Sequence, residues 1–154
     1  MVDDLSRFHG LTRPQLMSRI RSRGNKKTEI ALLKILREQK FTGWRRHAKL
    51  PGKPDFAFPR LKVAIFVDGC FWHGCPRHYK PPTTRGAFWE QKILTNRKRD
   101  RRVSRELRAK GWQVVRIWEC ALVGTRRPAT IQRLQRYLAP CPADAGDLPP
   151  AQHH

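Results

Sequence analysis

The sequence LKVAIFVD, residues 61–68, decides the fold, because it is a continuous apolar run with the length of one strand. Such a run predicts a strand that is buried on both faces. WQVVRIWE (112–119) predicts a second strand. The chain between them contains a loop rich in Gly, Cys, His and Pro over 69–85 and a long basic helix over 87–110, for which Gly111 suits the C-cap. A strand, a crossover helix and a further strand together predict an α/β domain.

The flanking segments add helices and complete the sheet. Hydrophobic residues at helical spacing follow Thr28 in TEIALLKILREQK, and the turn PGKP (51–54) predicts a strand on either side. We therefore expect a single domain with a central mixed sheet of three or four strands, flanked by helices. The expected organisation is a flexible N-terminus over 1–12, a domain over 13–139 that begins with a short basic helix (13–23) and ends with a helix (128–138), and a disordered tail over 140–154.

The charge of the chain indicates a polyanionic partner. Lys and Arg number 33 against 12 Asp and Glu, which gives a net charge of +21. Nucleic acid neutralises such an excess, whereas a membrane surface fits less well because the basic residues are spread along the whole chain. The sequence has no apolar run long enough to cross a membrane, and MVDDLSRFHG lacks the apolar core of a signal peptide. We therefore expect a soluble cytoplasmic protein that is associated with the nucleoid when it binds DNA.

Three cysteines and a histidine form a candidate metal site. Cys70, Cys75 and His78 have the spacing C-x4-C-x2-H, and Cys120 follows the second predicted strand. Three thiolates and an imidazole suit tetrahedral zinc, and four protein ligands would leave no open position, so the site would be structural. Alternatively, Cys70 and Cys120 are small buried hydrophobes and Cys75 is an incidental loop residue. Cys141 lies in the predicted tail and is not counted.

Two aspartates form a candidate magnesium site. Asp55 precedes one predicted strand, and Asp68 ends the next. An acid on each of two adjacent strands, within a basic protein, is how nucleases hold Mg²⁺ against a phosphate. Alternatively, Asp55 caps a turn after Pro54. Glu29 lies just inside a helix start, where the helix dipole favours a carboxylate whatever its function.

Aromatic residues and a histidine share the loop. Phe71, Trp72 and Trp89, flanked by Gly, His and Lys, are candidates for stacking on bases or for insertion between base pairs. Core packing is the alternative, and we expect it for Phe88. His73 is a candidate general base for an attacking water, but its type and position also allow a zinc ligand or a solvated loop residue.

Taken together, the motifs PGKPDFAF, VAIFVDGCFWHGCPRH and FWEQKILTNRKRDRRVSRELRAKGWQVVRIWEC resemble the very-short-patch-repair (Vsr-type) endonuclease family. The resemblance covers about residues 12–122. Members of this family nick double-stranded DNA on the 5′ side of the thymine in a T:G mismatch. Such mismatches arise when 5-methylcytosine deaminates, so the resemblance implies a functional link to a cytosine-5 DNA methyltransferase. It also implies a fold like that of type II restriction endonucleases, with catalytic Mg²⁺ and structural Zn²⁺.

The resemblance implies a role for each matching residue. It makes Asp55 the metal-binding and catalytic aspartate, His73 the catalytic histidine and Glu29 a supporting acid of the active site. It makes the backbone carbonyl of Val67 a magnesium ligand, a role that any side chain permits. The aromatic residues that would intercalate beside the mismatch are Phe71, Trp72 and Trp89, and the implied zinc ligands are Cys70, Cys75, His78 and Cys120.

The chain departs from the family pattern at two places. Asp68 stands where the best-known member has a histidine, so we count Asp68 as a candidate catalytic residue that could strengthen the metal site. The spacing between Cys75 and His78 also differs from that member. The acid-x-Lys motif of restriction endonucleases is missing after Asp55, so His73 would act on the attacking water instead.

Two other functions share much of this pattern. A zinc-stabilised DNA-binding module without catalysis would have the same charge and aromatic residues but would be indifferent to Mg²⁺. A restriction-type nuclease would cut both strands of matched DNA. We expect a monomer, because a single mismatch has no two-fold symmetry and the sequence shows no dimerisation helix.

Overall fold

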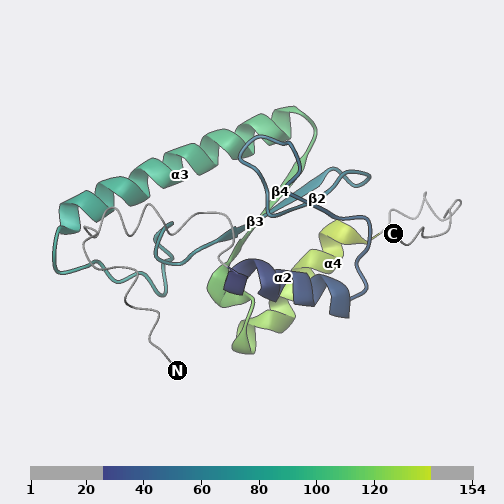
Figure 1. Cartoon of the computed structure of the whole chain (residues 1–154), viewed down its shortest axis with the longest axis horizontal. Helices are drawn as coiled ribbons and strands as arrows, with labels where there is room; N and C mark the ends of the chain where they lie inside the picture. Colours follow the sequence, from purple (N-terminus) through teal and green to yellow (C-terminus); the bar gives the residue numbers. More distant parts are fainter. Residues whose placement is uncertain (1–25, 140–154) are drawn as a thin grey trace, which may run out of the picture.

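The computed structural model describes residues 26–139, so the helix expected over 13–23, the N-terminus over 1–12 and the tail over 140–154 lie outside the described residues. Figure 1 shows helices on both sides of a small sheet. In chain order the helices and strands are α2 (Lys26–Glu38), β1 (Arg45–Arg46), β2 (Phe56–Phe58), β3 (Val63–Asp68), α3 (Gly86–Ala109), β4 (Gln113–Trp118) and α4 (Arg127–Leu138), with the short 3-10 helices η2 (Glu119–Ala121) and η3 (Gly124–Arg126) before α4.

The sheet has four strands in the order β1-β2-β3-β4. Strand β2 pairs antiparallel with both β1 and β3, whereas β3 and β4 run parallel, in a register that aligns Val63 with Gln113 and Asp68 with Trp118. A parallel pair needs a crossover connection, and the loop over 69–85 followed by α3 supplies it. The expected mixed sheet with a crossover helix is therefore confirmed.

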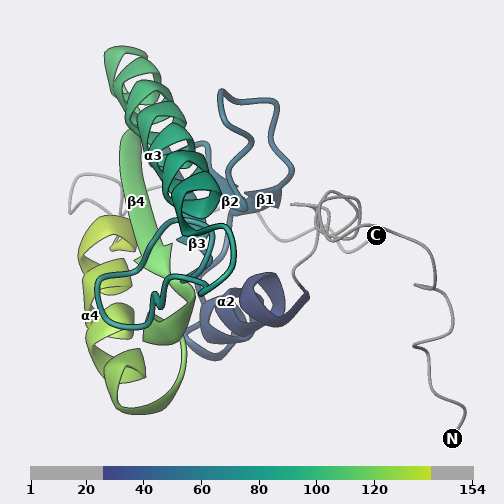
Figure 2. The ribbon, with the colours of Figure 1, turned by 90° about the vertical axis from the view of Figure 1, so that its left-hand side faces the viewer.

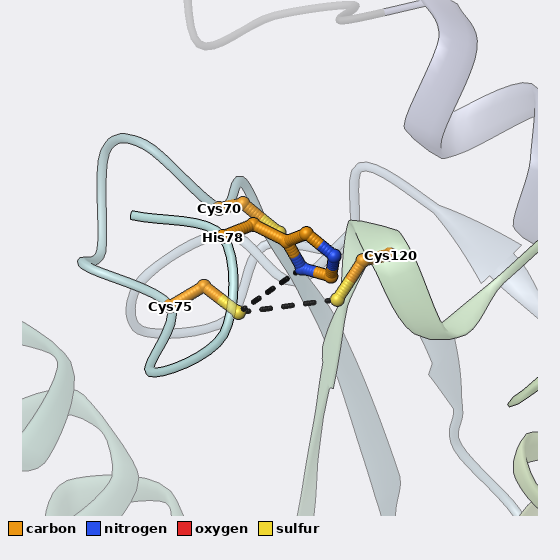
Figure 3. Close-up of side chains that lie close together, drawn as sticks. All are labelled: Cys70, Cys75, His78 and Cys120. Atoms are coloured by element: carbon orange, nitrogen blue, oxygen red, sulfur yellow. Dashed lines mark hydrogen bonds between the residues drawn. The ribbon is translucent and has the colours of Figure 1, made fainter. Parts of the chain in front are cut away.

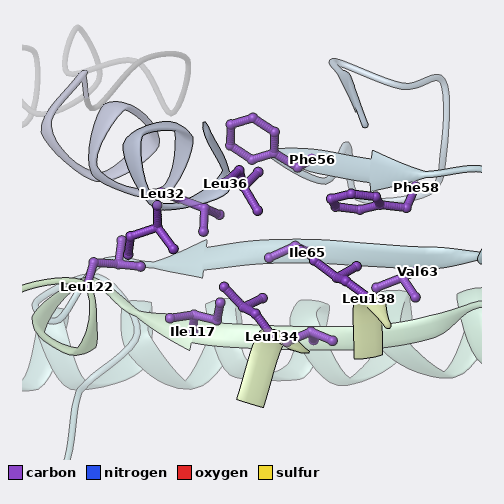
Figure 4. Close-up of a cluster of buried hydrophobic side chains, with 12 residues drawn as sticks. Leu32, Leu36, Phe56, Phe58, Val63, Ile65, Ile117, Leu122, Leu134 and Leu138 are labelled. Carbon is purple, nitrogen blue, oxygen red and sulfur yellow. The ribbon is translucent and has the colours of Figure 1, made fainter. Parts of the chain in front are cut away.

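The two faces of the sheet are covered by different helices, and Figures 1 and 2 show α3 on one side and α2 with α4 on the other. The larger core lies on the side of α2 and α4. On the opposite face, Ala64 and Phe66 pack against Val103 and Leu107 of α3. Figure 4 shows the larger core, whose buried residues are Leu32, Ile35, Leu36, Phe56, Phe58, Val63, Ile65, Val115, Ile117, Leu122, Leu134 and Leu138. Because both faces are covered, β3 is buried over almost its whole length, as its apolar run predicts.

The alternation of side chains along the strands determines which residues lie together on one face at the end of the sheet. Side chains two residues apart on a strand point to the same face, so Asp68 shares with Phe66 the face that α3 covers. Arg116 is aligned with Phe66 in the parallel pair and projects on that same face, with its guanidinium carbon 4.8 Å from the Phe66 ring centroid. The carboxyl ends of β3 and β4 therefore bring the loop after β3, the helix α3 and the turn η2 together.

The turn before β2 packs so closely on α3 that it requires glycine. Gly52 has a φ of +73°, and a Cβ at this position would lie 2.3 Å from Cγ1 of Val103 and 3.3 Å from Cε1 of Phe66. Gly43 has a similar φ of +80°, but nothing lies within 4 Å of its Cβ position. Replacing either glycine would therefore strain the backbone, but only the replacement of Gly52 would also cause a steric clash.

We expect Gly52→Ala to lower the free energy of unfolding by about 3 kcal/mol, because left-handed backbone strain and overpacking add. Gly43→Ala is the control and should lose only the strain, about 1 kcal/mol. Urea unfolding at equilibrium measures both. Equal losses in the two variants would contradict the close contact between the turn and α3.

Candidate active site and metal cluster

The loop after β3 folds back on itself and holds its cysteines near the sheet. The N–H of Cys75 donates to the carbonyl of Cys70 at 2.8 Å, and the N–H of Tyr79 donates to the carbonyl of Cys75 at 3.0 Å. Cys70 and Cys75 are buried, whereas His78 is exposed. The loop thus presents three candidate ligands toward Cys120, which lies in η2 directly after β4.

Figure 3 shows the side chains of Cys70, Cys75, His78 and Cys120 gathered in one cluster. Their ligand atoms all lie within 4.8 Å of one another. Sγ of Cys75 lies 3.9 Å from Sγ of Cys120 and 3.9 Å from Nδ1 of His78. A tetrahedron with Zn–S bonds of about 2.3 Å has sulfur atoms about 3.8 Å apart, so the spacing is that of a tetrahedral metal site. All three thiols are free of disulfides. The reading of these cysteines as unrelated small hydrophobes is therefore not supported by their geometry.

The surroundings favour a thiolate at the centre of this cluster. Burial would raise the pKa of the Cys75 thiol, but hydrogen bonds from the backbone N–H groups of Arg77 and His78 and from the His78 ring lower it to about 6. Burial raises the pKa of the Cys70 thiol to about 12 in the absence of an ion. Nη1 of Arg126 donates to Sγ of Cys120 at 3.4 Å. A divalent cation would ionise the remaining thiols by its own charge.

Asp55 lies beside the end of β3. Its Oδ2 accepts a hydrogen bond of 2.7 Å from the backbone N–H of Val67. The N–H and C=O of one strand residue point toward the same neighbouring strand, so the carbonyl of Val67 faces the side on which Asp55 lies. Burial raises the pKa of the Asp55 carboxyl, the negative charges of Glu29 and Asp68 raise it further, and the Val67 hydrogen bond opposes them. This carboxylate is therefore in an environment short of positive charge.

Glu29, in the first turn of α2, is buried and held by a basic residue of β1. Its Oε1 accepts hydrogen bonds from Nε and Nη2 of Arg46 at 2.8 and 2.5 Å, and Nε2 of His47 lies 3.9 Å away. Its position near Asp55 is consistent with the supporting role that the sequence suggests. That role stays a prediction.

Asp68 and His73 belong to a network that also includes Asp100 of α3 and Arg116 of β4. Nδ1 of His73 lies 2.6 Å from Oδ2 of Asp100 and 3.9 Å from Oδ1 of Asp68. Arg116 donates from Nε and Nη2 to the two oxygens of Asp68 at 2.7 and 2.5 Å. Both Asp68 oxygens are thus bound by Arg116, and the catalytic role predicted for Asp68 stays a prediction.

The charge balance of this network keeps Asp100 ionised. Burial alone would raise the pKa of the Asp100 carboxyl, but the hydrogen bond with His73 and the positive charge of Arg116 hold it below its ordinary value. An ionised Asp100 can only accept the hydrogen bond, so the N–H of a neutral His73 ring lies at Nδ1 and Nε2 carries the lone pair.

Two neighbours of Asp100 on α3 hold the backbone of the loop. Asn96 donates from Nδ2 to the carbonyl of Trp72 at 2.8 Å, and Arg97 donates to the carbonyls of His73 and Gly74 at 3.0 and 2.6 Å. Residues 72–74 are thereby fixed against one face of a rigid helix.

Sequence reasoning missed Asn96, Arg97, Asp100 and Arg116, although one signal was present for Asp100. It is an isolated acid inside the basic run NRKRDRR (96–102), where a charge opposed to all its neighbours calls for a specific partner. Arg116 interrupts the apolar strand sequence WQVVRIWE in the same way. Both residues are charges that the local pattern does not explain.

The predicted aromatic residues form one cluster beside His73. The ring of Phe71 lies 5.4 Å from Trp72 and 5.2 Å from Trp89 between centroids, and Trp72 lies 6.0 Å from Trp89. All three are half-buried. The core packing expected for Phe88 is wrong, because its side chain is 51% exposed. It lies in the first turn of α3, and its only ring contact among the described residues is a T-shaped one with Trp89.

No helix in the part of the chain that the structure describes is both long and apolar enough to cross a membrane.

Acidic and imidazole groups gathered at one edge of a sheet, in a chain of net charge +21, are typical of a DNA endonuclease.

The family described as DNA mismatch endonuclease Vsr matches residues 6–79. A type II nicking enzyme, V.XorIIP of Xanthomonas oryzae pv. oryzae, is 42% identical over 113 residues, which cover 71% of this chain and 81% of that enzyme. The DNA mismatch endonuclease Vsr of Escherichia coli is 42% identical over 95 residues, or 59% of this chain and 61% of that enzyme. The type II nicking enzyme V.NaeI of Lentzea aerocolonigenes is 51% identical over 67 residues, with 44% of this chain and 40% of that enzyme covered.

The chain therefore belongs to the Vsr family of DNA endonucleases. Its match spans less than two thirds of the length of the Escherichia coli and Lentzea enzymes and about four fifths of the Xanthomonas enzyme.

We expect the purified protein to contain one equivalent of zinc, measured by inductively coupled plasma mass spectrometry. Cys75→Ser removes the ligand at the centre of the cluster and should reduce the zinc content to near zero and destabilise the loop. Cys141→Ser is the matched control and should keep the full equivalent. Zinc content unchanged in Cys75→Ser would rule out the cluster as the binding site.

Asp55→Asn should stabilise the protein at neutral pH in the absence of Mg²⁺. The pKa of Asp55 is raised in the folded state, so its ionisation costs stability once the pH exceeds its ordinary pKa of 3.8. Asparagine keeps the acceptor for Val67 without the charge, and the gain should be about 0.5–2 kcal/mol. Urea unfolding at neutral pH should show the gain, and it should vanish below about pH 3, where the carboxyl is mostly protonated in both states. A loss of stability at neutral pH would contradict the described environment.

Proposed function

We propose that this protein is a Mg²⁺-dependent endonuclease that nicks one strand of double-stranded DNA on the 5′ side of the thymine in a T:G mismatch. The observation that carries the proposal is the arrangement at the end of β3. There the carboxylate of Asp55 is hydrogen-bonded to the backbone N–H of Val67, and the ring of His73 is hydrogen-bonded to Asp100. The names of the relatives support it, since one is a DNA mismatch endonuclease and others are nicking enzymes. The mixed sheet and crossover helix are compatible with a restriction-endonuclease-like fold.

Asp55 and the carbonyl of Val67 would hold the magnesium ion. Both offer oxygen, which Mg²⁺ prefers, and Asp55 lies close enough to Glu29 and Asp68 for their charges to raise its pKa, so a cation here relieves repulsion. When bound, the ion would supply charge stabilisation to the phosphoryl group and the leaving 3′ oxygen. A DNA phosphate would supply a further oxygen ligand.

His73 would act on the attacking water. With Nδ1 directed to Asp100, the ring offers Nε2 as the proton acceptor. The hydrogen bonds of Arg97 to the carbonyls of His73 and Gly74 fix the backbone that carries this ring. The water would lose its proton to Nε2 as its oxygen attacks phosphorus, and the 3′ oxygen would leave, giving a 5′-phosphate at the nick.

The aromatic cluster would read the mismatch through the deformability of the DNA. Phe71, Trp72 and Trp89 are held together at the start of α3 and only half-buried, so they can insert beside a base pair that unstacks easily. A T:G wobble pair unstacks at lower cost than a matched pair. Zinc on the four-ligand cluster would hold the loop that carries Phe71, Trp72 and His73. The exposed basic residues along α3 would bind the phosphates that flank the mismatch. They are Lys92, Lys98, Arg99, Arg101, Arg102, Arg105 and Arg108.

The mismatch chemistry implies the biological setting. T:G pairs arise by deamination of 5-methylcytosine, so we propose a functional link to a cytosine-5 DNA methyltransferase and action in the cytoplasm, at the nucleoid. A single mismatch lacks two-fold symmetry, which favours action as a monomer.

We expect Asp55→Ala to reduce Mg²⁺-dependent nicking of a T:G duplex by about 10³-fold or more, because the ion loses its carboxylate ligand and the charge stabilisation it supplies. Duplex binding, measured by fluorescence anisotropy without Mg²⁺, should change by less than about threefold, which is under 1 kcal/mol. Glu106→Ala, which removes an exposed acid of α3, is the control and should nick at the wild-type rate. Equal losses of binding and of nicking in Asp55→Ala would contradict the catalytic assignment.

A further inference from the structure

Arg116 is the charged residue of β4 that joins the acids around His73. Its Nε and Nη2 donate to both oxygens of Asp68, and Nη2 also lies 3.1 Å from Oδ1 of Asp100. The two acids come from different elements, the end of β3 and the middle of α3. One guanidinium therefore links both strands of the parallel pair to the crossover helix.

The position of this guanidinium is that of a cation between two carboxylates. The ligand atoms of Asp68, His73 and Asp100 lie within 4.8 Å of one another, which on residue type alone would fit a metal ion. Arg116 already occupies that position, since it binds both oxygens of Asp68 and one oxygen of Asp100. The planar fork of a guanidinium can hold two acids in fixed directions, whereas an ammonium is a single point charge.

Stability alone does not explain an arginine here. Its Nη1 is buried and has no hydrogen-bond partner within the described part of the chain. A buried donor without a partner is unfavourable, and replacing a buried ion pair by apolar residues is often neutral for stability or better. The protein nevertheless keeps the ion pair of Arg116 and its unpartnered Nη1 beside His73. In the proposed reaction, His73 is the residue that accepts the proton of the attacking water.

We propose that Arg116 is a positioning residue for His73: it orients Asp100 and separates it from Asp68, so that Asp100 fixes Nδ1 and leaves Nε2 directed outward. This inference rests on the proposed function for the role of His73, but the orientation itself does not depend on nicking. Without the guanidinium, Asp68 and Asp100 would repel each other and compete for Nδ1 of His73, which lies 3.9 Å from one and 2.6 Å from the other.

The experiment compares Arg116→Met and Arg116→Lys with the wild-type protein, and Arg136→Met is the matched control on the exposed face of α4. Thermal unfolding and zinc content first establish that each variant is folded. Single-turnover nicking at saturating T:G duplex gives the rate constant of the chemical step, and anisotropy gives the affinity. Long-range ¹H–¹⁵N spectra of the imidazole rings report the tautomer of His73 without any reaction.

For Arg116→Met we expect the rate constant to fall by about 10²-fold, the scale of a displaced general base, with affinity within about threefold of wild type. His73 should change from one Nδ1–H tautomer to a mixture. Arg116→Lys keeps the positive charge but not the planar fork of the guanidinium. We therefore expect its rate constant to fall, but by less than that of Arg116→Met. In Arg116→Ala, which leaves space, millimolar guanidinium should restore part of the rate, and it should restore none in Asp55→Ala.

A folded Arg116→Met variant with the wild-type rate constant and the wild-type tautomer would overturn the inference. If Arg116→Met does not fold, the lysine variant decides, and full activity in Arg116→Lys would show that the fork is not needed. If the wild-type protein nicks no T:G duplex, the proposed function fails, while the tautomer of His73 in the variants still decides the role of Arg116.

Discussion

The parallel pairing of β3 with β4 is the interaction on which the rest of the structure depends. The register that aligns Asp68 with Trp118 makes the two strands end together, one before the cysteine loop and the other before η2. Cys120 thereby meets Cys70 and Cys75, and Arg116 meets Asp68. A shift of one residue would turn Arg116 into the larger apolar core and separate the ligands of the metal cluster.

The helix α3 converts this pairing into a rigid site. It completes the crossover, packs Val103 and Leu107 on the sheet, and supplies Asn96, Arg97 and Asp100 to the loop. The aromatic cluster and the proposed general base are thus fixed to the same helix whose exposed face is strongly basic. In the proposed function, phosphate binding by α3 and insertion of the aromatic rings would present the scissile phosphate to one preassembled set of groups. The half-buried Asp55, whose pKa is raised in the free protein, would then be an acid kept for a cation at some cost in stability.

The sequence was a good guide to local structure and to residues that lie close in the chain. The apolar run over 61–68 predicted β3 because burial on both faces removes any alternation, and the spacing of Cys70, Cys75 and His78 predicted a cluster that geometry supports. The network around His73 could not be predicted, because Arg116 is 48 residues from Asp68 and 16 residues from Asp100 in the chain. Only the register of β3 with β4 and the packing of α3 on the sheet bring the three residues together. An aromatic ring such as that of Phe88 is expected in the core, yet the helix turns this side chain to solvent.

The central claim is that this Vsr-family chain recognises and nicks a T:G mismatch. The most direct test is a nicking assay on matched pairs of end-labelled duplexes, with Mg²⁺ or with EDTA. The two duplexes of a pair are identical except that one has a T:G pair where the other has T:A, and the flanking sequence varies from one pair of duplexes to the next. The account predicts a single cut 5′ of the mismatched thymine, on that strand only and only with Mg²⁺. Equal cutting of the matched duplex would contradict it in favour of a restriction-type nuclease, and tight binding without cutting in any flanking sequence would contradict it in favour of a zinc-stabilised DNA-binding module.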